Sequence, residues 1–565
     1  MKTEIFVMKS VIILLFTLKC SSVEDVRKGA VVTNGFGCSE IGAAILQKGG
    51  NAVDAAIAAL FCEGVSMPQS MGLGGGFLVT LYNKTTGEVW TMNARETAPK
   101  NAHRDMYLKD PDSSKWGGKA VGVPSELRGY WHLYQKFGGK VSWRELIEPT
   151  IKICTNGVKV TSYLAGVYKR KKDFLYKDPV MRSIYINSVT NDTYQEGENV
   201  KLLKLAETLK IIAEEGGDAL HNGSLTENFV KDVQDNDGIL TVEDMNNYLP
   251  IWEKPISVDL KNNQILYTSP LPASGILIAL ILNTLRDFVD TYNVDSVTAS
   301  QRIVETFKYA YGRRGEMGDP NFANVTELIN DYTSKSYATK IRALISDTKT
   351  YQNPEHYNAK FASPDDHGTA HISVLSPDGD AVAVTSTINL LFGAGFASKS
   401  TGIILNNEMR DFSSPNMLNG NGFASSPINF VAPGKRAVSA MCPVIILDGN
   451  KDVLMAIGGA GGPKITTAVS LVIMRHLWLG MDLKSAIYEK RFHHQLFPME
   501  ISFEPQYATE GRHIVDGLAK IGHKYINSPD DNGFAAITGI SGKDNSGTIS
   551  AWSDRRRPGY TTYVY

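Results

Sequence analysis

The chain has 565 residues, which is enough for one large domain or several smaller ones, and no linker-like change in composition marks a boundary. Its 58 lysine and arginine residues nearly balance 59 aspartate and glutamate residues, for a formal net charge of −1. This balance argues against a nucleic-acid partner or an acidic membrane surface and favours chemistry on small molecules.

The N-terminal segment has the pattern of a secretory signal. Lys2 and Lys9 precede an apolar run at 11–18, and small residues follow at 20–22, so we expect residues 1–22 to be a cleaved signal peptide and the protein to be secreted. The run is shorter than the about 20 residues that span a bilayer. An uncleaved N-terminal membrane anchor that holds the chain outside the cell is the alternative. Four N-glycosylation sequons fit export, although such triplets also arise by chance: Asn83, Asn191, Asn222 and Asn324.

The first regular elements are two short helices. Ser39 is expected to cap a helix that ends before the glycines at 49–50, and Asn51 to cap an alanine-rich helix from Ala52 to about Glu63. Helices joined by so short a turn run antiparallel. Cys38 and Cys62 therefore lie side by side, and export favours a disulfide between them. Cys154 and Cys442 lie in apolar surroundings and are expected to stay buried and unpaired.

The glycine-rich segment 70–77 fails the dinucleotide-binding spacing, because Phe77 occupies the last glycine position, and it has no phosphate-loop lysine. A tight packing turn before a strand at 77–82 is the expected role. Arg95 and Glu96 follow within NARETAP. Taken alone, such a pair is either a surface salt bridge or part of a ligand site.

Residues 102–362 predict mainly scaffold, with an amphipathic helix at about 201–215 and an apolar helix at 275–285. The sequence has no HExxH, no paired CxxC and no Gly-x-Ser-x-Gly. The sequence therefore gives no support for a zinc hydrolase or a serine hydrolase.

An alternating segment from Asp366 to Asn389 predicts a β-hairpin with its turn at Asp378. Counting outward from this turn pairs Thr369 with Thr387. Thr369 follows Gly368, so cleavage between them would free an α-amine beside the Thr369 hydroxyl. Such an amine has a pKa of about 8 and serves as a base near neutral pH. The segment alone is also compatible with an ordinary buried hairpin.

Several polar segments follow the hairpin. Residues 402–412 predict a short strand running into a turn where Glu408 and Asp411 either hold a ligand ammonium or are simply solvated. Ser439 precedes a strand at 444–447. Gly461 and Gly462 lie between a strand and a helix, where bare N–H groups can line an anion or oxyanion site. The clusters at 491–495 and 553–556 are predicted to be structural.

Taken together, these segments resemble the γ-glutamyltransferase (γ-glutamyl transpeptidase) family of N-terminal nucleophile hydrolases. The matching motifs occur in family order over nearly the whole mature chain: CSEIG, DAAIAAL, SMGLGGG, NARETAP, HGTAHISV, TSTINLLFG, GIILNNEMRDFSSP, GGAGG and RFHHQ. The resemblance implies an α/β fold (α+β), a four-layer αββα sandwich. It also implies autocatalytic cleavage of one precursor into a large subunit (23–368) and a small subunit (369–565), which form one domain as a heterodimer.

The resemblance also assigns roles. Thr369 matches the nucleophile, freed by cleavage after Gly368, and Thr387 matches the threonine that hydrogen-bonds it. Asn389, Glu408 and Asp411 match the family residues that hold the substrate's α-amino group. Arg95 and Ser439 match those that hold its α-carboxylate, and a guanidinium fork suits a carboxylate. Gly461 and Gly462 match the oxyanion hole. No metal and no cofactor are implied.

The implied reaction is attack of Thr369 on the γ-carbonyl of glutathione or another γ-glutamyl compound, followed by transfer of the γ-glutamyl group to water, an amino acid or a dipeptide. Three residues depart from the family pattern: Ala440 in place of a second serine, Arg410 where an acid is common, and Pro463 after the oxyanion glycines. We expect Ala440 to weaken substrate binding. The alternatives are a secreted γ-glutamyl binding protein or decoy with little turnover, and an acylase that acts on another amide.

Overall fold

A computed structural model of the protein describes residues 26–290, 296–361, 368–415, 423–528, 533–542 and 547–565. The predicted signal peptide at 1–22 lies outside these ranges. Of the sequon asparagines, Asn191, Asn222 and Asn324 are exposed and Asn83 is half-buried.

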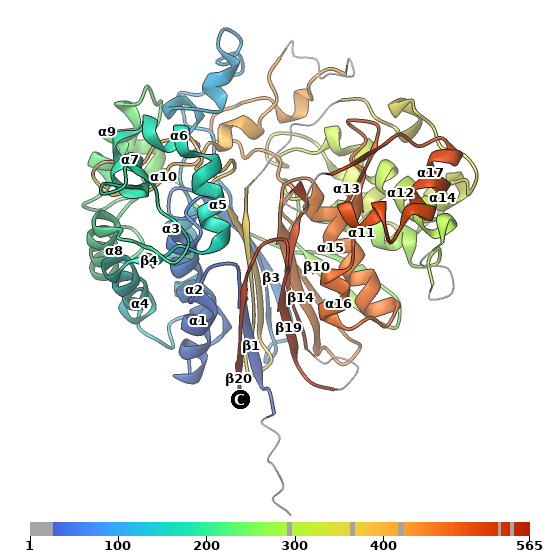
Figure 1. Cartoon of the computed structure of the whole chain (residues 1–565), viewed down its shortest axis with the longest axis horizontal. Helices are drawn as coiled ribbons and strands as arrows, with labels where there is room; N and C mark the ends of the chain where they lie inside the picture. Colours follow the sequence, from blue (N-terminus) through green and yellow to red (C-terminus); the bar gives the residue numbers. More distant parts are fainter. Residues whose placement is uncertain (1–25, 291–295, 362–367, 416–422, 529–532, 543–546) are drawn as a thin grey trace, which may run out of the picture.

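Two antiparallel sheets face each other at the centre of the molecule (Figure 1). Among the described residues, the first sheet has seven strands in the spatial order β20 (Tyr560–Val564), β1 (Gly29–Thr33), β11 (Ala370–Leu375), β12 (Ala381–Thr387), β2 (Gly76–Asn83), β3 (Glu88–Ala94) and β8 (Ile251–Glu253). The second has six, in the order β19 (Ser550–Ser553), β18 (Ala536–Ser541), β14 (Val453–Ala460), β13 (Val444–Leu447), β10 (Ile265–Thr268) and β9 (Ile256–Asp259).

Helices cover the outer face of each sheet, which gives four layers (Figure 1). On the side of the first sheet lie α1 (Cys38–Gln47), α2 (Ala52–Ser66), α3 (Glu126–Phe137), α4 (Trp143–Asn156), α5 (Ser162–Arg170), α6 (Lys172–Lys177), α7 (Pro179–Tyr185), α8 (Leu203–Glu215), α9 (Thr226–Gln234) and α10 (Val242–Asn247). On the side of the second lie α11 (Gly275–Leu285), α12 (Val297–Gly312), α13 (Thr326–Thr333), α14 (Lys335–Leu344), α15 (Lys464–Ile473), α16 (Leu483–Tyr488) and α17 (Arg512–Ile521). The predicted αββα sandwich is confirmed.

A buried apolar cluster fills the space between the sheets and combines alanines, such as Ala30, Ala383 and Ala456, with larger residues, such as Tyr82 and Ile445. The helical layers pack through mainly apolar helices such as α11, in which every residue is buried. Each sheet therefore buries one face against the other sheet and the opposite face under helices.

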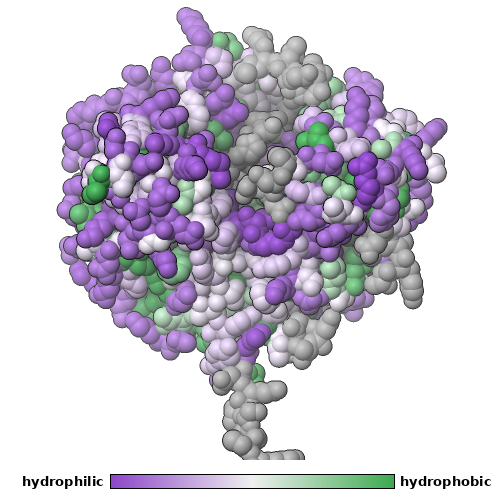
Figure 2. Space-filling model, viewed as in Figure 1, coloured by the Kyte–Doolittle hydropathy of each residue, from purple (hydrophilic) through white to green (hydrophobic). Residues whose placement is uncertain are grey.

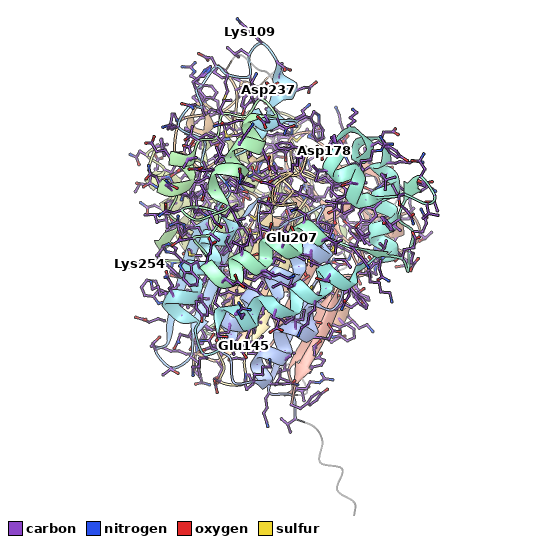
Figure 3. All side chains as sticks on the ribbon, turned by 90° about the vertical axis from the view of Figure 1, so that its left-hand side faces the viewer. Lys109, Glu145, Asp178, Glu207, Asp237 and Lys254 are labelled. Carbon is purple, nitrogen blue, oxygen red and sulfur yellow. A yellow bond between two sulfur atoms is a disulfide. The ribbon has the colours of Figure 1, made fainter. Side chains whose placement is uncertain are left out.

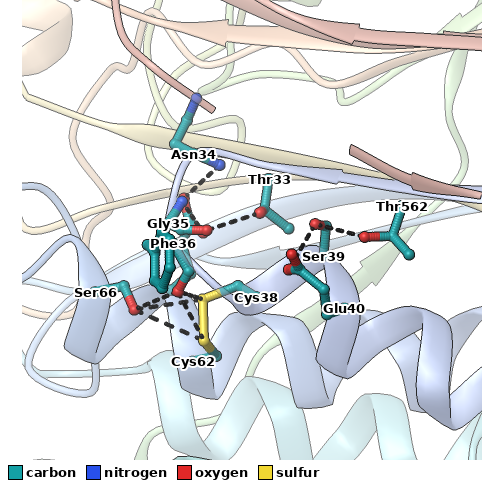
Figure 4. The surroundings of a disulfide bond; sticks show 11 residues. Thr33, Asn34, Gly35, Phe36, Cys38, Ser39, Glu40, Cys62, Ser66 and Thr562 are labelled. Carbon is teal, nitrogen blue, oxygen red and sulfur yellow. Dashed lines mark hydrogen bonds between the residues drawn. A yellow bond between two sulfur atoms is a disulfide. The ribbon is translucent and has the colours of Figure 1, made fainter. Parts of the chain in front are cut away.

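The disulfide prediction is confirmed, and it joins the first turn of α1 to the last turns of α2. Cys38 and Cys62 are bonded, with their Cα atoms 5.3 Å apart (Figure 4). Cys154 and Cys442 are buried and unpaired, as predicted. Asn51 caps α2 as expected, accepting from the amides of Val53 at 3.0 Å and Asp54 at 2.9 Å, although the helix runs three residues beyond Glu63.

The predicted cap at Ser39 is wrong. Helix α1 begins at Cys38, so Ser39 lies inside its first turn, and the residue before the helix is Gly37, which has a positive φ of 80°. The Ser39 hydroxyl instead donates to Glu40 at 3.0 Å and accepts from Thr562 on β20 at 2.9 Å (Figure 4). A tertiary contact with Thr562 therefore occupies the Ser39 hydroxyl oxygen, which the local sequence indicated as the helix cap.

Polar side chains cover both helical layers on the face shown in Figure 2. The exposed Glu145 on α4 and Glu207 on α8 mark the outer side of the first layer (Figure 3). Within the described ranges, no helix is both long and apolar enough to cross a membrane.

A buried ion network fixes the turn that leads into the last strand. The carboxylate of Asp554 accepts from Arg491 at 2.8 Å and from Arg556 at 2.9 Å, and Arg556 also donates to Glu504 at 2.6 Å. All of these side chains are almost inaccessible to solvent. The prediction that the clusters at 491–495 and 553–556 are structural holds for these residues.

Replacing Asp554 by Asn should lower the free energy of unfolding by about 3–5 kcal/mol, because two buried guanidinium groups lose a charged partner. Urea unfolding at neutral pH measures the change. The matched control is Asp235→Asn in the exposed Lys231–Asp235 pair on α9, where the loss should stay below about 1 kcal/mol. Equal losses in the two variants would contradict this account.

Candidate active site

The predicted hairpin forms from β11 and β12, and it lies in the middle of the first sheet. Ala370 pairs with Ser386, so Thr369 lies opposite Thr387. The Thr387 hydroxyl donates to the carbonyl oxygen of Gly368 at 2.8 Å and accepts from the amide of Asn389 at 2.8 Å. The Thr369 hydroxyl donates to the same carbonyl oxygen. Two threonine hydroxyls therefore converge on the peptide group that precedes Thr369.

Close backbone packing explains the glycines around this hairpin. Gly368 has a φ of 104°, and a Cβ there would overlap the carbonyl oxygen of Asn389. A Cβ at Gly75 would overlap the carbonyl oxygen of Thr387. The glycine-rich segment 70–77 is thus a packing turn, as predicted. It packs against the backbone of Thr387.

Arg95 directly follows β3 and is fully buried, which excludes the surface salt bridge. Its guanidinium pairs with Glu408 and, at 2.5 Å, with Asp411. It also donates to the carbonyl oxygens of Ala437 at 2.8 Å and Val438 at 3.1 Å. One cation and two carboxylates thus form a single buried ion cluster.

Glu408 and Asp411 are the first and last residues of a short 3-10 helix, in which positions three apart are eclipsed. Both are buried, so the alternative of two solvated acids is excluded. The strand predicted before this turn is wrong, since only an isolated bridge at Ile404 forms. Instead of strand pairing, the side-chain amide of Asn406 holds this segment by donating to the carbonyl oxygens of Gly74 at 2.7 Å and Gly122 at 2.9 Å.

Two further predicted residues join the cluster. Asn389 donates from its amide to Asp411 at 2.9 Å and to the carbonyl oxygen of Asn407 at 3.2 Å. Ser439 directly follows Val438, whose carbonyl binds Arg95. The Ser439 oxygen accepts from the amide of Met441 at 3.2 Å, which leaves its proton for another acceptor.

Buried glutamates surround these groups. Desolvation raises the pKa of Glu96 to about 8, against the opposing charge of Arg95. Desolvation also raises the pKa of Glu126 to about 8, and Glu126 accepts from Ser386, next to Thr387, at 2.8 Å. Both carboxyls are therefore largely protonated at neutral pH and add little negative charge beside Arg95.

The glycine turn at 461–462 lies at the same end of the sandwich as Thr369. Leu375 at the end of β11 packs in one cluster with Val453 at the start of β14. Near the other ends of these strands, a Cβ at Gly458 would overlap the ring of His371. The two strands therefore run in opposite directions across the sheets, and the end of β14 comes beside the start of β11. Gly461 and Gly462 have positive φ values of 133° and 62°.

Arg557 contacts the site and was missed by the sequence analysis. Its guanidinium donates to the carbonyl oxygen of Thr369, and the residue is 9% exposed. Its amide donates to the carbonyl of Asp554 at 3.2 Å, so the buried ion network holds its backbone. The only sequence signal is the basic run 555–557 before the last strand, which does not reveal that β20 returns beside β1 and thus near β11.

A family model described as gamma-glutamyltranspeptidase matches residues 38–564. The chain is 40% identical over 537 residues to Scoloptoxin SSD14 of Scolopendra dehaani, covering 94% of this chain and 92% of that protein. It is 36% identical over 496 residues to Glutathione hydrolase 3 of Arabidopsis thaliana, covering 87% and 77%. It is also 36% identical over 496 residues to the Glutathione hydrolase 5 proenzyme of Mus musculus, covering 86% and 84%.

Solved structures share the fold. A cephalosporin acylase from Bacillus halodurans superposes with a TM-score of 0.81 at 23% identity, over 95% of this chain and 96% of that chain. The gamma-glutamyltranspeptidase of Helicobacter pylori gives a TM-score of 0.52 at 30% identity, over 55% of this chain and 89% of that chain. The acylase match speaks to the fold alone.

Glu96→Gln should flatten the dependence of stability on pH. In the folded protein Glu96 keeps its proton up to about pH 8, whereas in the unfolded chain it ionises above about pH 4.5. Its contribution to stability is therefore lost as the pH rises through this window. Urea unfolding at pH 5 and pH 9 should show a smaller loss in the variant than in the unmodified protein. An unchanged loss would mean that Glu96 is ionised in the fold.

Proposed function

The chain belongs to the gamma-glutamyltranspeptidase family, and we propose that it is a γ-glutamyltransferase and glutathione hydrolase whose nucleophile is Thr369. The observation that carries the proposal is the convergence of the Thr369 and Thr387 hydroxyls on the carbonyl of Gly368. The buried cluster of Arg95, Glu408 and Asp411 supplies the second half of the site.

The same arrangement supports autocatalytic cleavage as part of this proposal. The Thr369 oxygen attacks the carbonyl carbon of Gly368, and an ester bond forms while the peptide C–N bond breaks and its nitrogen takes up a proton. Thr387 donates to the carbonyl oxygen as negative charge develops on it. Water then hydrolyses the ester, which leaves the Gly368 carboxylate at the end of the large subunit and a free α-amine on Thr369.

The freed Thr369 then acts on a donor. Its α-amine accepts the hydroxyl proton while the oxygen attacks the γ-carbonyl, and the N–H groups of Gly461 and Gly462 stabilise the oxyanion. The amine component leaves with that proton, and water or an acceptor amine resolves the γ-glutamyl ester. Arg557 holds the Thr369 carbonyl oxygen and so fixes the backbone that carries both the nucleophile and its base.

The ion cluster suits the zwitterionic end of a γ-glutamyl group. When this end enters the cluster, Arg95 and Ser439 bind its α-carboxylate, and Asn389, Glu408 and Asp411 bind its α-ammonium. Charges of opposite sign then alternate from the guanidinium through the substrate to the carboxylates. An α-linked amide lacks one of the two free α-groups, so the site selects the γ-linkage. Glutathione is the expected donor, and amino acids or dipeptides are the expected acceptors.

The extracellular setting belongs to the same proposal. Residues 1–22 act as a signal peptide, with an uncleaved anchor as the alternative. The Cys38–Cys62 disulfide is compatible with an oxidising compartment. Exposure of Asn191, Asn222 and Asn324 leaves these sequons accessible to glycosylation.

Thr369→Ala should abolish both cleavage and turnover. The secreted unmodified protein should yield a fragment whose N-terminal sequence starts at Thr369, and it should release the amine from a chromogenic γ-glutamyl anilide. The Ala variant should stay uncut and lose at least about 10³-fold in activity, whereas Thr369→Ser should keep both. An uncut, inactive unmodified protein would overturn the proposal. A correctly cut but inactive one would favour the binding protein or decoy.

Ala440→Ser should lower the Michaelis constant for the donor. Ala440 is buried beside Ser439, and one restored hydrogen bond to a charged carboxylate contributes about 1.5 kcal/mol or more, which is roughly tenfold in binding. Ala440→Cys is the matched control, because a thiol is a weak donor. An unchanged constant in the Ser variant would show that Ser439 alone suffices.

A further inference from the structure

A cavity of about 530 Å³ lies in the helical layer over the second sheet, between α12, the end of α15 and the start of α17 (Figure 1). Its volume is within the roughly 300–1,000 Å³ that small-molecule sites occupy. Much of its wall is apolar and comes from buried side chains, namely Ile303, Leu471, Met474, Phe492 and Ile514.

This cavity is separate from the candidate active site. Helix α15 begins directly after the glycine turn with Lys464, and Leu471 lies about 10 Å further along it, since a helix rises 1.5 Å per residue. In the short strand β15 (Phe492–His493), Phe492 lines the cavity, whereas His493 bonds to Thr467 of α15 at 2.7 Å. A ligand in this cavity would therefore not occupy the place of the proposed substrate.

An irregular helical turn shapes the cavity wall. Helix α15 continues into a π-helical turn, Met474–Trp478, in which the amide of Leu479 donates to the carbonyl oxygen of Met474, five residues earlier, at 3.2 Å. Such turns are rare and occur frequently at functional sites. This turn brings Met474 and Arg475 to the wall of the cavity.

Arg475 is a buried cation with an unmet hydrogen-bonding need. The residue is 7% exposed. Its Nη2 donates to the carbonyl oxygen of Lys490 at 2.8 Å, and its buried Nη1 has no hydrogen-bond partner among the described residues. Leaving a buried, charged donor without an acceptor is costly. An anion bound at this wall would supply the acceptor.

The other charged groups on the wall leave it positive. Lys490 pairs with Glu489 at 2.9 Å, and Glu510 and His513 are exposed to solvent. Desolvation acts to raise the pKa of Glu489, but the hydrogen bond from Lys490 and the charge of Arg475 outweigh it and lower the pKa below its ordinary value. The cations therefore dominate the potential at the buried part of the wall, despite the two glutamates.

We propose that this cavity binds a small organic anion, a carboxylate on an apolar body, with the carboxylate on Arg475 and the body against Leu471 and Phe492. A guanidinium fork suits a carboxylate. The volume equals that of about 18 water molecules at roughly 30 Å³ each, which suits a short aromatic or aliphatic acid. The proposal does not depend on the proposed function.

Isothermal titration calorimetry of the full chain with 4-phenylbutyrate tests this site. Excess L-glutamate is present throughout, so that the proposed substrate site at Arg95 is filled. One saturable site is expected. The neutral analogue 4-phenylbutan-1-ol should bind at least about tenfold more weakly, because a charge-assisted hydrogen bond is lost. Arg475→Gln should weaken binding of 4-phenylbutyrate by a similar factor, and Arg475→Lys should weaken it less.

Ser300→Trp is a second variant, which fills the cavity from α12 without changing Arg475 and should abolish binding. Arg128→Gln is the matched control, since Arg128 is an equally buried arginine, 9% exposed, on α3 outside the cavity. It should leave binding unchanged. No saturable binding by the unmodified protein at millimolar concentrations, or binding that survives both Arg475→Gln and Ser300→Trp, would overturn the proposal. Failure of the unmodified protein to release the γ-glutamyl anilide would contradict only the proposed function.

Discussion

The register of one hairpin is the constraint on which the site depends. Pairing of Ala370 with Ser386 brings the Thr387 hydroxyl to within 2.8 Å of the carbonyl oxygen of Gly368. A slip of one residue would turn each side chain to the other face of the sheet. The glycines at 75 and 368, whose Cβ atoms would overlap neighbouring carbonyls, allow the close packing around this hairpin. These two glycines therefore serve a single hydrogen-bond geometry.

We propose that the ion cluster serves the binding site rather than the stability of the fold. Removing the charges of Arg95, Glu408 and Asp411 from water carries a desolvation penalty that their mutual attraction only partly offsets. The backbone carbonyls of Ala437 and Val438 and the amide of Asn389 orient the three groups. Glu96 and Glu126, kept protonated by burial, limit further negative charge. The result is a buried cluster of one guanidinium and two carboxylates, which the proposed zwitterionic substrate would enter.

Local signals predicted the elements well, and tertiary contacts account for the failures. The helix at 275–285 followed from its apolar run and the hairpin from its alternating pattern, and the Cys38–Cys62 bond followed from two antiparallel helices joined by a short turn. The predicted helix cap at Ser39 is wrong because its hydroxyl oxygen accepts from Thr562, which is far along the chain. The contact of Arg557 with Thr369 was not predictable, because it depends on the last strand returning beside the first. The roles proposed for Arg95 and Glu408 required the family resemblance, since short motifs do not report burial.

The most direct test is to locate the acyl group during turnover. Rapid acid quenching with excess glutathione, followed by peptide mass spectrometry, should find a γ-glutamyl group on the peptide whose N-terminus is Thr369, attached at the side-chain oxygen. Fragmentation that places the group on another residue, or turnover by a chain still joined between Gly368 and Thr369, would contradict the account.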